Sequence, residues 1–93
     1  MINDVLFQKL SALTLEELTA VRRSALEPLI DAQKRFALGM ISERELLAIT
    51  LSVNENVGQM PTAPGMTREV VKLQVGGFVE ETELAIRERL LEL

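Results

Sequence analysis

The residues of this chain that could do chemistry are mostly carboxylates near its end. Paired carboxylates can act as general acid and base, or bind a divalent metal, when a pocket shifts their pKa values. Glu83 precedes Arg87 by four residues, which is the spacing of an ion pair on one helix face, and its neighbours fit a solvated surface. We therefore expect a charged helix surface and no catalytic or metal site. The glutamates concerned are Glu80, Glu81, Glu83, Glu88 and Glu92.

The residue types that complete most catalytic sites are absent. The chain has no His and no Cys, so nucleophile and base pairs and most transition-metal sites lose their usual members. No Ser lies in a GxSxG setting, and Gly76-Gly77 lacks the further glycines or the lysine of a phosphate-binding loop. Residues 54–56 resemble the start of a calcium loop, but the later Gly and Glu positions do not match. The sequence predicts a non-enzymatic protein with no catalytic residue, metal, cofactor or small-molecule substrate.

Arg22 has the least expected position of the charged residues. On a regular helix it falls in the middle of an apolar face that includes Leu18, Ala25 and Leu29. An unpaired buried guanidinium is very costly, so this side chain must pair, extend to solvent or meet a partner. One interpretation is a polar anchor at an interface between helices. The more common arrangement is an exposed edge beside a carboxylate.

Six further residues are candidates for contact with a protein partner. From Leu46 to Val53 there is no charge, and apolar side chains point around the whole helix, which indicates burial within the fold or between subunits. Residues 54–65 are rich in Asn, Gly and Pro, which predicts a long arm that reaches a neighbour. Two leucines of the last helix lie off its main apolar stripe and could contact a second chain. The candidates are Leu47, Leu51, Met60, Met66, Leu84 and Leu91.

The helices that position these residues begin with two similar stretches, 13–18 (LTLEEL) and 41–46 (ISEREL). In each, a hydroxyl residue can cap the first free N–H groups and a Glu three residues later can reach back to the cap. Pro28 removes a backbone donor from the helix that follows Thr14, which predicts a kink or a break near 24–27. The expected helices cover 4–13, 15–38, 42–53, 67–76 and 78–92.

Two points about the last third stay open at this stage. Residues 66–75 are rich in β-branched side chains, so a short strand is the alternative to a helix. Gly76 and Gly77 weaken a helix, yet an apolar stripe continues across them. One kinked helix and two separate helices fit this pattern equally well.

Composition favours a single all-α domain spanning residues 1–93. The chain is 47% hydrophobic but only 3% aromatic, so its core must be built from aliphatic side chains, as in helix bundles. The fold class we expect is a small bundle of four to five helices with a long irregular connection at about 54–65. The first residues do not look like a signal peptide, and no stretch has the roughly 18 apolar residues of a membrane helix, so we expect a soluble cytoplasmic protein.

These observations predict a protein that acts by protein–protein interaction. Its apolar helix faces exceed what one small chain comfortably covers, so the expected partner is first the chain itself, as a homodimer or higher oligomer. Adaptor, chaperone, inhibitor and assembly factor fit the sequence equally. The alternative is a helix-turn-helix DNA-binding regulator, since Arg22, Arg23, Lys34, Arg35 and Arg44 concentrate positive charge in the first half. A net charge of -4 and a nearly uncharged helix after Ser42 weigh against that alternative.

Overall fold

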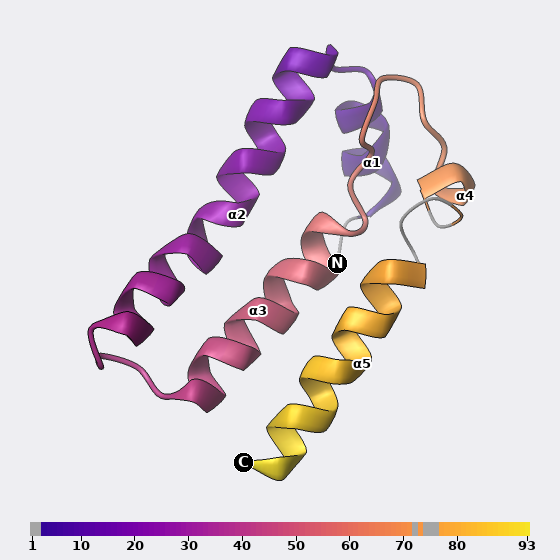
Figure 1. Ribbon diagram of the computed structural model, residues 1–93. Coiled ribbons are helices and arrows are strands. Elements are labelled where there is room, and N and C mark those ends of the chain that lie inside the picture. The colour runs from indigo at the N-terminus through magenta and orange to yellow at the C-terminus, as the bar shows by residue number, and fades with distance from the viewer. Residues whose placement is uncertain (1–2, 72, 74–76) are drawn as a thin grey trace.

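The structure is a computed structural model that describes residues 3–71, 73 and 77–93, the last range without the side chains of 77–79. Its helices, in chain order, are α1 (Asp4–Ser11), α2 (Leu15–Ala37), α3 (Glu43–Val57), α4 (Arg68–Val71) and α5 (Gly77–Glu92) (Figure 1). No strand occurs within the described ranges, so the predicted all-α fold is confirmed. Continuity across Gly76-Gly77 lies outside the described residues, as does most of the expected helix after Val71.

Both predicted capping boxes are present. Thr14 Oγ1 accepts a hydrogen bond from the Glu17 N–H at 3.2 Å, and Glu17 Oε1 accepts from the Thr14 N–H at 3.2 Å. At the start of α3, Ser42 Oγ accepts a hydrogen bond from the Glu45 N–H at 3.1 Å, and Glu45 Oε1 accepts one from the Ser42 N–H at 3.4 Å. Each box satisfies two backbone donors that a helix start otherwise leaves free.

The long helix α2 continues through Pro28 without a break. It ends at Ala37 with Leu38 as its C-cap, and the next residue, Gly39, has a φ of +74° that is readily adopted only by a residue without a Cβ atom. The Gly39 N–H donates to Phe36 O at 3.0 Å and the Met40 N–H to Arg35 O at 2.8 Å, the paired bonds of a Schellman motif. The chain thereby reverses direction and returns as α3.

The irregular connection starts later than the expected residue 54, because α3 continues to Val57. Within this extra turn Glu55 forms an ion pair with Arg87 of α5, and Val53 just before it is buried. These contacts between distant segments outweigh the weak helix preference of Asn54 and Asn56. The connection therefore occupies residues 58–67.

The three longer helices form an open layer, with α3 between α2 and α5 (Figure 1). Each helix contributes one buried apolar residue to this layer, namely Ala32 from α2, Val53 from α3 and Ile86 from α5. The larger core lies at one end, where α1, the start of α2 and α4 meet. It consists of Phe7, Leu10, Leu18 and Val71, with Leu13, Val21, Met60 and Met66 packed around it.

The molecule is extended for its size. Its Cα radius of gyration is 14.5 Å, against about 12 Å for a compact domain of this length. Its accessible surface is 6454 Å², whereas a monomer of its mass exposes about 5,400 Å². The open layer accordingly leaves roughly 1,000 Å² more surface in water than a closed bundle would.

Candidate protein-interaction surface

A row of apolar side chains on α2 is left in water. Leu15, Leu26 and Ile30 are 58%, 36% and 47% exposed, although each is a large hydrophobic residue. At 3.6 residues per turn, Leu26 lies about 140° around the helix from Val21, which packs on the α1 core. From the buried Leu18 it lies about 80° around the helix, so the row lies beside the face of α2 that packs on that core. We call it the outer row of α2, and it consists of Leu15, Thr19, Arg22, Leu26, Ile30, Gln33 and Ala37.

Arg22 is the member of the outer row that lies nearest the packed side of α2. Its side chain is half-buried, and its Nε atom is buried without a hydrogen-bond partner among the described residues. The expected neighbouring carboxylate is therefore not found in the described part of the chain. A guanidinium donor left without an acceptor is costly, so Arg22 retains an unmet hydrogen bond next to exposed apolar surface.

Leu47 and Leu51 face α5 of the same chain. They lie between Glu43 and Glu55 in a row of four-residue steps along one side of α3. Glu55 forms an ion pair with Arg87, and Glu43 accepts a hydrogen bond from Arg89 Nη2 at 2.8 Å. Both leucines are half-buried. Part of each side chain is therefore covered by the chain's own fold, and contact with a second chain stays a prediction.

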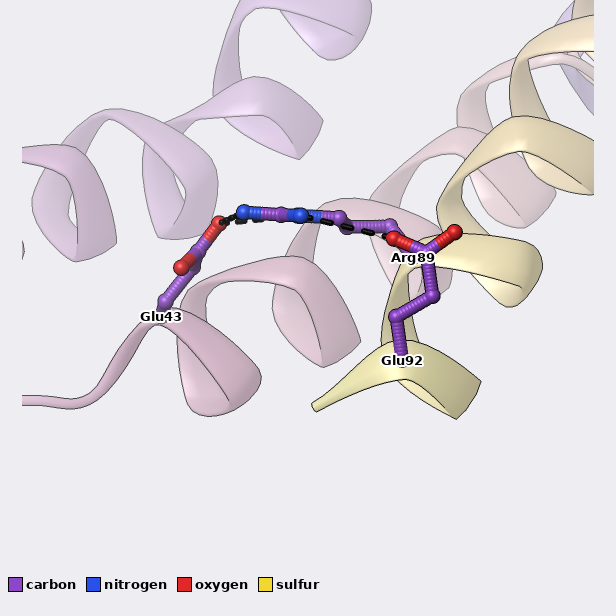
Figure 2. Close-up of polar contacts among 3 residues, drawn as sticks. All are labelled: Glu43, Arg89 and Glu92. Carbon is purple, nitrogen blue, oxygen red and sulfur yellow. Dashed lines mark hydrogen bonds and ion pairs between the residues drawn. The ribbon is translucent and has the colours of Figure 1, made fainter.

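Arg89 joins the C-terminal end of α5 to the start of α3 (Figure 2). Its guanidinium lies between Glu43 of α3 and Glu92 of its own helix, at 2.8 Å and 3.4 Å. The hydrogen bond and charge of Glu43, and to a lesser extent those of Glu92, raise the pKa of Arg89 above its usual value. Nearby, Arg44 Nη2 donates to the backbone carbonyl of Leu90 at 3.1 Å. These exposed polar contacts align α5 with α3 and add little stability individually.

Met60 and Met66 are packed inside the chain, so the prediction of a free arm is wrong. Both contact the core formed by α1, α2 and α4, and Pro61 between them is fully buried. Two hydrogen bonds join the segment to α1: the Gly65 N–H donates to Ser11 O at 2.9 Å, and Ser11 Oγ donates to Met66 O at 3.0 Å. The connection closes the core that the short helix α1 cannot cover alone.

Leu84 and Leu91 remain exposed, at 59% and 87%. On a regular helix they lie about 140° to 160° around α5 from the buried Ile86. Because Ile86 marks the packed side, both leucines face away from the layer. They are spatially separate from the outer row of α2, which lies beyond α3 (Figure 1).

Two further cations of the described residues, Arg35 and Arg68, are paired within the chain. Arg35, one of the five cations considered for DNA binding, forms an ion pair with Asp31 at 3.0 Å. A cleft of about 390 Å³ between α1 and α4 contains Arg68, which pairs with Asp4 at 3.3 Å and lies 5.3 Å from the centre of the Phe7 ring. Its charge is neutralised there by Asp4, so the cleft offers no free cation for an acidic ligand.

The described residues include no group of three acidic side chains placed to hold a metal ion. None of the helices in these ranges has the length and hydropathy needed to cross a membrane.

Comparison of this chain with protein-family models, with curated proteins and with solved structures gives no match. The outer row of α2 is therefore interpreted from its own geometry. The sequence singled out Arg22 in this region but neither Leu26 nor Ile30. Their apolar side chains widen the apolar face of the helix, and this width is the sequence signal that could have identified them.

Proposed function

We propose that this protein acts by binding other proteins, without catalysis, and that its first partner is a second copy of itself. An adaptor, chaperone, inhibitor or assembly factor would work in this way, and a cytoplasmic location is part of the proposal. The observation that carries it is the exposed outer row of α2, with three large apolar residues on one helix face. Contiguous exposed apolar surface rimmed by polar residues is typical of interaction sites.

The amount of exposed surface supports the same proposal. The chain exposes roughly 1,000 Å² more than a monomer of its mass, and a standard interface buries about 800 Å² per partner. One interface of ordinary size would thus return the chain to the surface area of a compact protein. Further apolar surface is exposed at the C-terminal end of α2 and in the turn to α3, at Phe36, Leu38 and Met40.

Co-purification of an untagged copy of the chain with a tagged copy tests the proposal. We expect the untagged chain, co-expressed with a tagged one, to be retained with it through washing. A matched control is an unrelated helical protein carrying the same tag. If the tagged chain is folded and no untagged chain accompanies it, self-association is contradicted.

A further inference from the structure

The side of α5 that faces away from α3 carries two exposed leucines between acidic flanks. Leu84 and Leu91 are seven residues apart, which places them about 20° apart around the helix and about 10 Å apart along it. Exposed glutamates lie on both flanks, with Glu80 about 40° to one side of Leu84 and Glu88 about 40° to the other. We call this surface the outer face of α5, and it consists of Glu80, Glu81, Leu84, Glu88 and Leu91.

The cations of α5 do not neutralise its outer face, because both are bound to α3. Arg89 pairs with Glu43, and Arg87, which the sequence pairs with Glu83, reaches instead to Glu55. The three glutamates of the outer face have no ion-pair partner among the described residues. With five carboxylates and two guanidiniums, α5 holds a charge of -3 out of the net -4 of the chain.

This charge limits what can cover the outer face of α5. The same face of a second copy would bring three carboxylates of each chain together, which is unfavourable. The phosphates of nucleic acid and of anionic lipids would be repelled for the same reason. Apolar residues between acidic flanks are instead complementary to a helix that carries apolar residues between lysines or arginines.

We propose that the outer face of α5 binds a basic amphipathic helix of another protein. Leu84 and Leu91 contact the apolar side of that helix, and the glutamates beside them pair with its lysines or arginines. Two anchors seven residues apart match the i, i+7 spacing at which helices present their apolar side chains. The outer row of α2 lies at the opposite edge of the layer (Figure 1), so this contact goes beyond self-association and does not depend on it.

Titration with a synthetic helical peptide tests the proposal. The probe is a peptide of leucine and lysine whose leucines follow the three- and four-residue steps of one helix face. The matched control peptide has the same composition in scrambled order. By isothermal titration calorimetry at fixed salt, we expect the wild-type chain to bind the amphipathic peptide at least about tenfold more tightly, because only that peptide presents its leucines on one side.

Substitutions show which face of the chain binds the peptide. Glu81→Lys with Glu88→Lys should weaken binding at least about tenfold, since attraction to lysine becomes repulsion. The matched control is Glu16→Lys with Glu27→Lys, which makes the same change of charge at exposed positions of α2 and should leave the affinity within about twofold. Leu84→Ser should also weaken binding although it retains every charge. Circular dichroism checks that each variant keeps its helical content.

Several results would overturn the proposal. Equal affinity for the two peptides, or no binding of either, would show that the leucines are not recognised. Equal weakening by the control pair would place the peptide elsewhere on the chain. A smaller assembly for Glu81→Lys with Glu88→Lys than for the wild type would identify a second copy as the occupant. A wild-type chain that binds the peptide as expected but has the mass of one chain would contradict the proposed self-association alone.

Discussion

Replacing Leu18 by alanine should destabilise the protein far more than the same change at Leu91. Leu18 is 1% exposed and lies in the core with Phe7, Leu10 and Val71, whereas Leu91 is 87% exposed. The variant Leu18→Ala removes three buried carbon atoms, worth about 0.8 kcal/mol each in transfer free energy. The cavity left behind raises the expected loss to about 3 kcal/mol.

That loss is large for a chain of this size. A domain of 93 residues has an unfolding free energy of about 5 to 14 kcal/mol, so Leu18→Ala should lower the Tm by about 15 °C. The control Leu91→Ala should change the unfolding free energy by less than about 0.5 kcal/mol. Urea unfolding followed by circular dichroism is the suitable assay, because the chain has no Trp or Tyr for fluorescence. Protein concentration must be equal in all samples, since self-association contributes to apparent stability.

Equal losses for the two variants would refute the argument that the core lies at the α1 end of the molecule. A large loss of unfolding free energy for Leu91→Ala alone would indicate that the stabilising contacts lie on the outer side of α5.

Further predictions concern the helix ends and the open end of the layer. Thr14→Ala and Ser42→Ala should each lower the unfolding free energy by about 1 kcal/mol, and an unchanged urea midpoint for both would contradict their capping role. Gly39→Ala should cost about 1 kcal/mol through its left-handed backbone alone, because no atom lies within 4 Å of the added Cβ, and Gly39→Asn should cost less. A double-mutant cycle on Glu43 and Arg89 should give a favourable coupling that weakens as salt is added; a coupling unaffected by salt would contradict an exposed ion pair.

Local features of the fold could be predicted from the sequence. Thr14 with Glu17 and Ser42 with Glu45 lie within one turn of each other, so helix starts are encoded where they occur. The end of α3 could not be predicted in the same way, because it depends on the contact of Glu55 with Arg87, 32 residues later. Composition and periodicity therefore indicate a helix bundle, but the exact ends depend on which helices become neighbours.

The candidate surface was only partly predictable for the same reason. Met60 looked like part of a free arm, because its neighbours are turn-forming residues; its burial depends on α1, which lies more than 40 residues earlier. For Leu47 and Leu51 the sequence left open burial within the fold or between subunits, and it did not indicate that they lie on the side of α3 that pairs with α5. Leu26 and Ile30 are exposed only because α2 lies at the edge of an open layer.

The most direct test of self-association through α2 is the solution mass of the wild-type chain by sedimentation equilibrium at micromolar concentrations. We predict the mass of two chains, and a shift towards the mass of one chain for the variant Ile30→Asp, with helical content retained. A folded wild-type protein that has the mass of one chain at every concentration would contradict the account.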